Sequence, residues 1–506
     1  MTTSNLLTLV PLVLLTLSAV PAVLIFMFPE RAVRPRIAIN ITAATTKVLL
    51  VAALIPFILD ASIAPELRFP FLPGVDLVLR VDSLSLLFTM LSALLWLVTT
   101  IYAIGYLDGR PNRRRFFGFF ALCVTATVGI AFAGNLVTFL LFYEMLSLVT
   151  YPLVAHYGTV PALKAARLYL YYALGGGLLF LTGTVWLTAL IGPVEFSVGG
   201  VQAVADLAAE QPGVAAAIFC LFVAGLGVKA ALFPFHGWLP RAMVAPAPVS
   251  ALLHAVAVVK AGAFGLIRII DDLYGVQVAS SLGVLKPLLF LAAFTVIYGS
   301  VRALLQEDIK KRLAYSTVSQ VSYIALGLSM LSVTATTGGL VHLVHQGLSK
   351  ITLFFCAGLA AEVWGIKKIS QLDGLGKRMP LTSAAFTVGA LSMIGIPPMA
   401  GFITKWQLGT GAINADESWV VGVLISSALL NAAYFLPVVI RMWFREPAQM
   451  PDGPVLERTR AVLEAPPALL WPAVTTAVFA LAVGLFAGVP YSPLDVASYL
   501  AERVYQ

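Results

Sequence analysis

The chain has 506 residues, of which 60% are hydrophobic and only 11% are charged. A soluble globular protein is closer to one quarter charged, so this balance excludes an ordinary soluble fold and indicates a polytopic membrane protein. The formal net charge of +8 does not indicate a nucleic-acid-binding protein, because the basic residues are spread over short loops between apolar runs.

Apolar runs long enough to cross a bilayer recur along the whole chain. We predict an all-α polytopic membrane protein with about 14 transmembrane helices, since a span needs about 20 apolar residues. The runs cover residues 4–28, 38–59, 82–107, 116–134, 135–154, 163–191, 214–236, 246–269, 284–303, 313–331, 338–362, 381–410, 419–441 and 467–489. No basic segment precedes the first run, which is expected to be a retained span and not a cleaved signal peptide. Between the second and third runs, the prolines and alternating residues of 62–81 predict an external hairpin.

The connections between the runs alternate in charge. The even-numbered connections are poor in basic residues and hold acids such as Asp271 and Asp272. Cytoplasmic loops carry an excess of Lys and Arg, so the alternation predicts a cell inner (plasma) membrane protein with both termini outside. The basic residues of the odd-numbered connections are Arg31, Arg34, Arg36, Arg110, Arg113, Arg114, Arg115, Lys164, Arg167, Arg241, Arg302, Lys310, Lys311, Arg312, Lys367, Lys368, Lys377, Arg378, Arg441, Arg445, Arg458 and Arg460.

Other basic residues lie inside the runs, where a charge costs roughly 2.5 to 3.5 kcal/mol on insertion scales. They are Lys47, Lys229, Lys260, Arg268, Lys286, Lys350 and Lys405. Arg268 and Lys286 lie near the ends of their runs, and we expect them to extend to the membrane surface. Lys47 lies deeper and away from other polar groups, so both a function and a structural contact are open. The remaining four lysines have polar neighbours and indicate an ion path.

The segment from Gly225 to Lys260 combines buried charge with helix breaks. Its four prolines free backbone carbonyls that hydrocarbon cannot satisfy, so the seventh helix is expected to be broken against protein or a water-filled cavity. His254 and Lys260 are six residues apart and point to different sides, so they would serve successive steps of a relay. His236 lies near the end of its run, where a capping role and proton transfer are both open.

Glu144 is the one carboxylate well inside a run. Burial disfavours the charged form of a carboxylate, so Glu144 is expected to be neutral or paired with a cation. Lys229 is the natural partner. Such a pair releases a proton when its members separate, and the alternative is a static interhelical salt bridge.

The eleventh run places His342 and His345 three residues apart on one helical face, with Lys350 five residues further on. Histidine changes charge near neutral pH, which suits a proton relay. Two histidines at this spacing also suit a metal, but no third ligand is near. The cysteines Cys123, Cys220 and Cys356 are far apart and lack metal-site spacing. We therefore expect no metal and no other cofactor.

The twelfth run contains GIPPMAGFITKW, in which Pro397 and Pro398 break the helix before Lys405. Lys405 follows Lys229 by 176 residues, and the same offset carries Glu144 onto Gln320. Spans four to eight and nine to thirteen are therefore interpreted as inverted five-helix repeats, as in transporters with broken helices near the midplane. The predicted divisions are N-terminal helices with the hairpin (1–115), a first repeat (116–269), a second repeat (284–441), and a cytoplasmic loop, last helix and short tail (442–506).

Several motifs resemble one family in order. DSLSLLF from Asp82, VKAALFPFHGWLPRAMVAPAPVSALLHA, DIKKRLAYSTVSQVSYIALG from Asp308, HQGLSK and GIPPMAGFITKW resemble the proton-translocating antiporter-like subunits. That family is shared by Mrp cation/proton antiporters, complex I and membrane-bound hydrogenases, and the resemblance covers nearly the whole chain. Lys405 stands where the M-type subunit of complex I typically has a glutamate and where the L-type, N-type and Mrp D-type subunits have a lysine. A-type Mrp and L-type subunits usually carry a longer C-terminal extension than this sequence shows, so we expect the resemblance to be greatest to the Mrp D-type subunit.

The resemblance implies roles for particular residues. Glu144 and Lys229 resemble the coupling pair, Lys260 the central relay residue and Lys405 the terminal proton-handling lysine. The weaker members of the relay are His254, His342, His345 and Lys350.

Three functions are compatible with this pattern. The first hypothesis is the proton-translocating subunit of a multisubunit monovalent cation (Na+)/proton antiporter, with homologous antiporter-like subunits and other membrane subunits as partners. The alternative is a proton-pumping membrane-arm subunit of a complex I-like NADH-quinone oxidoreductase or a membrane-bound hydrogenase, in which this chain catalyses no chemistry itself. A further alternative is an inorganic-carbon uptake subunit. Protons and Na+ are the expected ligands, and no nucleic acid is expected.

Overall fold

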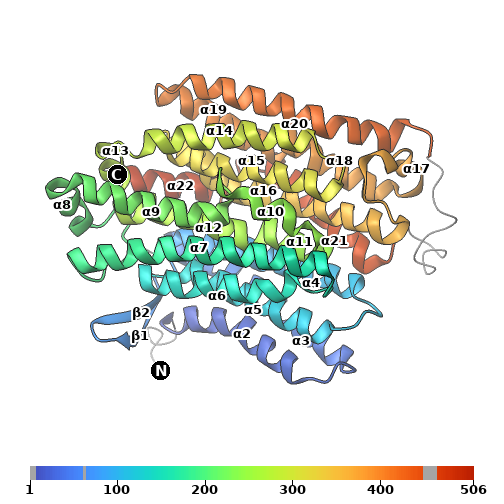
Figure 1. The fold of residues 1–506 in the computed structure, drawn as a ribbon, viewed down its shortest axis with the longest axis horizontal. Coiled ribbons are helices and arrows are strands. Elements are labelled where there is room, and N and C mark those ends of the chain that lie inside the picture. Colours follow the sequence, from blue (N-terminus) through green and yellow to red (C-terminus); the bar gives the residue numbers. More distant parts are fainter. Residues whose placement is uncertain (1–6, 61–63, 448–463) are drawn as a thin grey trace.

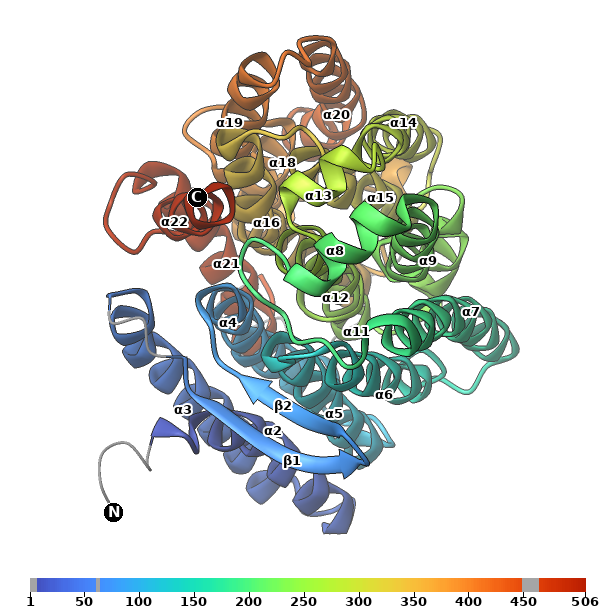
Figure 2. The ribbon, with the colours of Figure 1, turned by 90° about the vertical axis from the view of Figure 1, so that its left-hand side faces the viewer.

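A computed structural model of the chain describes residues 7–60, 64–447 and 464–506. The long helices run side by side and form one bundle (Figure 1). We call one end of the bundle the hairpin end; it faces the viewer in Figure 2. It carries β1 (Glu66–Leu72), β2 (Val75–Arg80), α8 (Gln202–Glu210), α13 (Val276–Ser281) and α22 (Pro493–Tyr505). The opposite end carries η5 (Ile369–Gln371) and α17 (Leu375–Arg378).

The helices of the bundle begin at polar residues in several places. Asp82 accepts a hydrogen bond from the Ser85 amide at 2.7 Å, and Asn135 accepts one from the Thr138 amide at 2.8 Å. Such caps satisfy amides that have no partner in the first turn. The long helices are α2 (Val10–Met27), α3 (Val33–Asp60), α4 (Ser83–Tyr106), α5 (Arg113–Phe132), α6 (Leu136–Val154), α7 (Val160–Ile191), α9 (Pro212–Ala230), α14 (Leu285–Leu304), α15 (Ile309–Leu328), α16 (Val333–Trp364), α18 (Pro380–Ile394), α19 (Ala400–Asn414), α20 (Trp419–Phe444) and α21 (Pro467–Leu485).

The centre of the bundle is built from short helical pieces. After α9 the chain forms η1 (Phe235–Gly237), α10 (Trp238–Arg241), η2 (Ala242–Val244), α11 (Ala247–Ala251), η3 (Leu252–Val256), α12 (Val258–Ile267) and η4 (Arg268–Tyr274). The wider turns of η3 and η4 are π-helical. Every residue from Ala247 to Tyr274 is buried, and Figure 2 shows α12 surrounded by other helices. The seventh and twelfth predicted helices are both broken, the twelfth between α18 and α19.

Among the described residues, twelve helices are long and apolar enough to cross a membrane. The two other predicted spans differ for physical reasons. α15 begins with three basic residues and carries hydroxyl and amide side chains through its middle, while α18 and α19 have 15 residues each because the chain breaks between them. The fold is a polytopic helical membrane protein, and the count of fourteen stays a prediction.

The hairpin lies in the segment 62–81, where we expected one. β1 and β2 are antiparallel, with Glu66 opposite Arg80. Arg68 and Arg80 each bind both Glu66 and Glu195, at distances between 2.5 and 2.6 Å, so the hairpin is tied to the loop after α7. Some predicted features lie outside the described residues: Arg458, Arg460, residues 4–6 of the first predicted span, 62–63 of the hairpin segment and much of the loop after 441.

Candidate functional site

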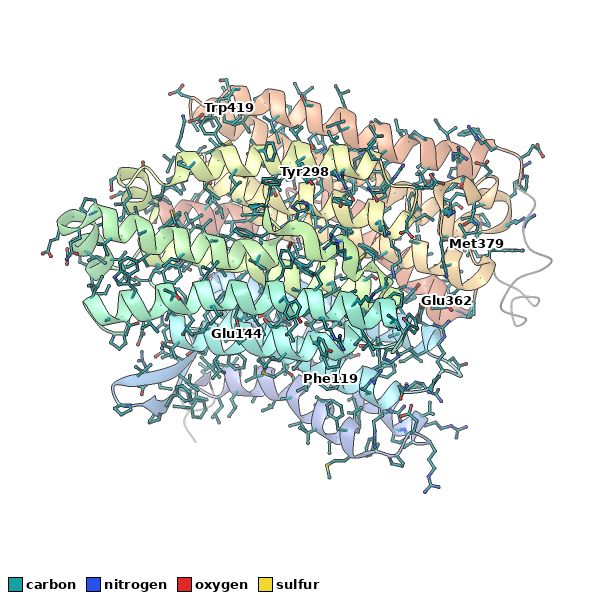
Figure 3. The ribbon with its side chains drawn as sticks, in the orientation of Figure 1. Phe119, Glu144, Tyr298, Glu362, Met379 and Trp419 are labelled. Atoms are coloured by element: carbon teal, nitrogen blue, oxygen red, sulfur yellow. The ribbon has the colours of Figure 1, made fainter. Side chains whose placement is uncertain are left out.

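The predicted relay residues lie on a continuous row of helices. α6 packs on α7, α7 on α9, α9 on α12, α12 on α15, α15 on α16, and α16 on α19. Glu144 lies between the two ends of the bundle (Figure 3). The lysines Lys229, Lys260 and Lys350 are buried within the row, and Lys405 is half-buried at its end.

The first two relay residues are neighbours without forming an ion pair. Lys229, on the last turn of α9, donates to the Tyr143 carbonyl, and its Nζ lies 3.2 Å from the centroid of the Tyr143 ring. Glu144 follows Tyr143 and interacts electrostatically with Lys229, but its Oε1 has no hydrogen-bond partner among the described residues. The side chain of Glu144 lies against Gly177 of α7, where a Cβ would meet Oε1 at 1.8 Å. Glu144 and Lys229 are therefore neighbours, as the expected pairing requires, but they form no direct salt bridge in this structure.

Lys260 reaches from α12 to α16. Its Nζ donates to the Leu343 carbonyl at 2.8 Å, between the positions of His342 and His345. His254, six residues earlier in η3, stacks on Phe354 with ring centroids 4.5 Å apart. These contacts bring the central lysine and the predicted histidines to one interface.

The residues of α16 face two neighbouring helices. The Nδ1 of His345 lies 3.0 Å from the Thr404 hydroxyl of α19, and the ring of His342 packs edge-on against Tyr323 of α15. Lys350 donates to the Ser316 hydroxyl of α15. α16 thus carries polar groups toward both α15 and α19.

Lys405 closes the row at the second helix break. Its Nζ donates to the carbonyls of Met393 at 3.2 Å and Ile394 at 2.5 Å, at the C-terminus of α18. A cation is stabilised by the unpaired carbonyls and the dipole at a helix C-terminus. Lys405 therefore holds the end of α18 from the far side of the break.

Many buried polar atoms along this row have no hydrogen-bond partner within the described part of the protein. They are Glu144 Oε1, both ring nitrogens of His254 and of His342, His345 Nε2, Gln320 Nε2, and Gln346 Nε2 and Oε1. Buried polar groups are nearly always hydrogen-bonded, to protein or to water. These atoms belong to α6, η3, α15 and α16, and their chemistry suits water molecules as partners. The row is a polar seam suited to proton transfer.

We expected Arg268 and Lys286 to extend to the membrane surface, and the structure agrees for Lys286 only. Arg268 does not extend to the surface: it is 3% exposed and ion-paired with Asp82 at 2.8 Å and Asp272 at 2.7 Å. Lys286 is exposed and pairs with Glu417. Lys47 is buried, donates to the Ser18 hydroxyl at 2.8 Å and lies 5.1 Å from the centroid of the Trp96 ring, a structural contact outside the row.

The expectation that Asp271 and Asp272 lie in a loop was wrong. Both belong to η4, which extends the eighth span to Tyr274, and both are at least 96% buried. The loop before α8 folds over this turn, with the Ser197 amide donating to the Asp272 carbonyl at 2.9 Å. This covering contact joins residues far apart in the sequence, so local hydropathy could not show it.

The structure also places His236, whose role the sequence left open, and shows site residues that the sequence did not indicate. His236 is buried beside Phe233 and Tyr298, with ring centroids 5.8 and 4.9 Å away. Tyr143 and Thr404 contact relay residues, but nothing in the sequence around them indicates these contacts. Gly177 ends a run of three glycines in an apolar helix, and that run was a visible sign of a close approach.

Comparison with known proteins gives consistent matches. Residues 133–430 match the family described as NADH:quinone oxidoreductase/Mrp antiporter, TM, and residues 74–117 match NADH-Ubiquinone oxidoreductase (complex I), chain 5 N-terminus. NADH-quinone oxidoreductase subunit N of Desulforudis audaxviator is 37% identical over 82% of each chain. The putative antiporter subunit mnhA2 of Staphylococcus haemolyticus is 31% identical over 71% of this chain, and the match spans only 46% of that relative.

Solved structures show the same fold. A chain of the Mrp complex from Dietzia sp. DQ12-45-1b superimposes with a TM-score of 0.85 at 24% identity, covering 100% of this chain and 98% of that one. A chain of respiratory complex I from Thermus thermophilus superimposes with a TM-score of 0.72 at 25% identity, covering 94% and 98%.

Proposed function

The chain belongs to the NADH:quinone oxidoreductase/Mrp antiporter family of proton-translocating membrane subunits, and we propose that it moves protons along the polar seam from Glu144 to Lys405. The observation that carries the proposal is the seam itself: lysines on α9, α12, α16 and α19 in adjacent helices, with unpaired polar atoms between them. Charges inside a membrane are costly, and their usual use is an ion path.

Each residue has a role in this proposal. Glu144 and Lys229 are the coupling pair, whose open arrangement leaves each free to change charge when the other moves. Lys260 is the central relay residue, joined to α16 by its bond to the Leu343 carbonyl. Lys405 is the terminal residue at the second helix break. The groups that accompany Lys260 are His254, His342, His345 and Lys350.

The repeats are part of the same proposal. We propose that residues 116–269 and 284–441 are inverted five-helix repeats, flanked by 1–115 and 442–506. Shifting the sequence by the 176 residues that separate Lys229 from Lys405 does not align the two helix breaks. Lys229 lies before the break that follows α9, whereas Lys405 lies after the break between α18 and α19. Pro234 and Pro398, which lie in the two breaks, are 164 residues apart. The breaks therefore favour an alignment by these prolines, in which the two lysines approach from opposite sides.

We propose a multisubunit monovalent cation (Na+)/proton antiporter as the assembly, with other membrane subunits as partners, in the cell inner (plasma) membrane. The Mrp likeness of the fold and the antiporter relative support it. The second candidate, a membrane-arm subunit of a redox-driven proton pump, is supported by the 37% identity to subunit N. The co-purifying subunits separate the two candidates: small hydrophobic antiporter subunits favour the first, and iron–sulfur and quinone or hydrogenase subunits the second.

The test of proton transport is a Glu144→Gln variant of the whole complex in everted membrane vesicles. We expect transport to fall at least about 100-fold, as for loss of a positioned acid–base group, with the complex still assembled. Glu210→Gln, an exposed glutamate in α8, is the matched control and should transport normally. Wild-type transport in the Glu144→Gln vesicles would refute the relay.

A further inference from the structure

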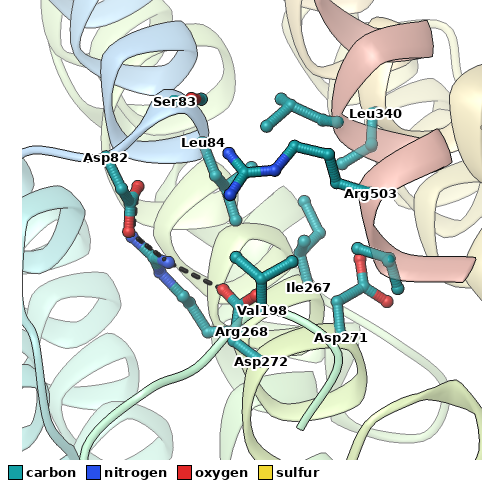
Figure 4. A pocket seen from close by; sticks show the side chains of 12 residues that line it. Asp82, Ser83, Leu84, Val198, Ile267, Arg268, Asp271, Asp272, Leu340 and Arg503 are labelled. Carbon is teal, nitrogen blue, oxygen red and sulfur yellow. Dashed lines mark hydrogen bonds and ion pairs between the residues drawn. The ribbon is translucent and has the colours of Figure 1, made fainter. Parts of the chain in front are cut away.

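A cluster of charged groups lies at the hairpin end of the buried eighth span. Arg268 donates to Asp272 at 2.7 Å and to Asp82, which caps α4, at 2.9 Å. Figure 4 shows the guanidinium of Arg268 between these two carboxylates. Arg268 therefore pairs with Asp82 as well as with the carboxylate of its own helix. These three residues form a closed ionic framework.

Asp271 lies beside this framework and does not belong to it. It is 2% exposed, its Oδ1 has no hydrogen-bond partner, and no ion pair holds it among the described residues. Figure 4 shows Asp271 apart from the three framework residues, on the side where α22 passes. A buried carboxyl group without a cation of its own is costly to keep unless it has a use.

Asp271 lines a cavity of about 40 Å³ together with the framework residues, Ser83 and Arg503. This volume has room for about three water molecules. The lining brings three carboxyl groups against two guanidinium groups, so a single proton balances the charge. A metal cation would lie against both guanidinium groups, and no group of three metal-ligating side chains occurs among the described residues.

The cavity is aligned with the polar seam. Ile267, which also lines it, is seven residues after Lys260, and Asp271 is eleven residues after Lys260. These spacings keep the three residues near one face of the helix, with Asp271 about 16 Å from Lys260 along the axis. Leu340 of α16 lines the cavity two residues before His342. The two π-helical segments of this span hold His254 and Asp271, and such segments are frequent at functional sites.

We propose that Asp271 is a proton-binding group at the hairpin end of the relay, which exchanges its proton with water in this cavity. When the carboxyl O–H bond breaks, the proton passes to water and leaves a carboxylate, so the cavity lining carries one net negative charge until a proton returns. The inference rests on the proposed proton transport and adds the place where the seam meets one membrane surface. The charged and titratable groups that face Asp271 are Asp272 and Arg268 of its own helix, Arg503 and Tyr505 of α22, and Asp82 ahead of α4.

The experiment compares Asp271→Asn, Asp271→Glu and Asp206→Asn in vesicles that contain the whole complex. Asp206 is exposed in α8 at the same end and serves as the matched control. Transport is measured while the pH of each side is varied separately, and rates are divided by the amount of assembled complex. We expect Asp271→Asn to fall at least about tenfold and to lose its response to pH on the hairpin side, because an amide does not exchange a proton. Asp271→Glu should keep both the transport rate and the response to pH on the hairpin side.

The outcomes separate this inference from the proposed function. If Glu144→Gln abolishes transport while Asp271→Asn retains the normal rate and pH response, the proton site is wrong and the relay stands. If Asp271→Glu is as inactive as Asp271→Asn, Asp271 has a packing role and the inference fails. A rise in the half-saturating Na+ concentration with an unchanged pH response would identify a cation site and overturn the proposal.

Discussion

All four lysines of the polar seam donate to backbone carbonyls, and Lys350 also donates to a hydroxyl group. Lys229 donates to the Tyr143 carbonyl, Lys260 to the Leu343 carbonyl, and Lys350 to the Ser316 hydroxyl. A buried ion pair fixes both of its charges, because removing one leaves the other uncompensated. Neutral acceptors impose no such penalty when an amine loses its proton. Arg268, held by two carboxylates, is the contrasting case of a fixed charge.

The position of Glu144 depends on a missing side chain. Gly177 leaves room for the carboxylate, and a Cβ there would lie 1.8 Å from Oε1. Gly177→Ala should therefore turn Glu144 away from its place beside α7. We expect transport to fall at least about tenfold, since a displacement of 1 Å can cost about 100-fold in a positioned reaction. Proton transport in vesicles measures the effect.

The same helix supplies the control for this variant. A Cβ added at Gly175 would meet no atom within 4 Å, so Gly175→Ala should leave transport unchanged. It should also stabilise α7, because alanine is favoured over glycine by up to about 1 kcal/mol in a helix. Equal loss of transport in both variants would point to the helix backbone and contradict the positioning role of Gly177.

At the level of elements, helix breaks and their caps arrange the seam. Lys405 of α19 donates to the last carbonyls of α18, so one side chain joins the two halves of the broken helix. Asn431 of α20 also donates to the Met393 carbonyl, at 3.0 Å. Carbonyls freed by a break would be costly in hydrocarbon without such partners. The break is therefore stable where it is because three helices meet there.

The hairpin is an element whose attachment depends on pH. Hydrogen bonds from Arg68, then Arg80, lower the pKa of Glu195 below its usual 4.5, outweighing partial burial. A lowered pKa in the folded state means that this contribution is present above pH 4.5 and is lost as pH falls through the lowered value. The protection factors of the β2 amides, which are the intrinsic exchange rates at each pH divided by the measured rates, should stay constant from neutral pH to about 4.5 and decrease below it. Protection factors that already decrease near pH 6, close to neutrality, would contradict this linkage.

At the scale of the whole molecule, the sequence predicted what depends on local pattern. Lys229, Lys260 and Lys405 were predictable because a lysine in an apolar run is costly wherever it lies. Asp271 was not, because its burial depends on the loop before α8 and on α22, which are distant in the sequence. Tyr143 was missed for a similar reason: its carbonyl is an acceptor only because α9 passes beside α6. For both residues, contacts between segments distant in the sequence determine the role, and a local pattern cannot show such contacts.

The membrane topology of the whole chain is testable at two helices that hydropathy leaves undecided. Ser418 and Asp206 are exposed at connections that we predict on the hairpin side, and Lys377 is exposed at the opposite end. If α15 crosses the membrane, five crossings separate residue 206 from residue 377, and the two lie on opposite sides. If α18 and α19 together cross once, residues 377 and 418 also lie on opposite sides.

The topology is measured with single cysteines introduced at these three positions. The background chain carries Cys220→Ser, because Cys220 is the exposed native thiol, whereas Cys123 and Cys356 are buried. In intact cells, a membrane-impermeant thiol reagent should label Asp206→Cys and Ser418→Cys, because the positive-inside rule places the basic connections in the cytoplasm. Lys377→Cys should react only after the membrane is opened. Labelling of positions 206 and 377 from the same side would mean that α15 does not cross, since its three leading basic residues and polar middle would then lie outside the bilayer. A seam through α15 and α16 would then have no second membrane surface to reach.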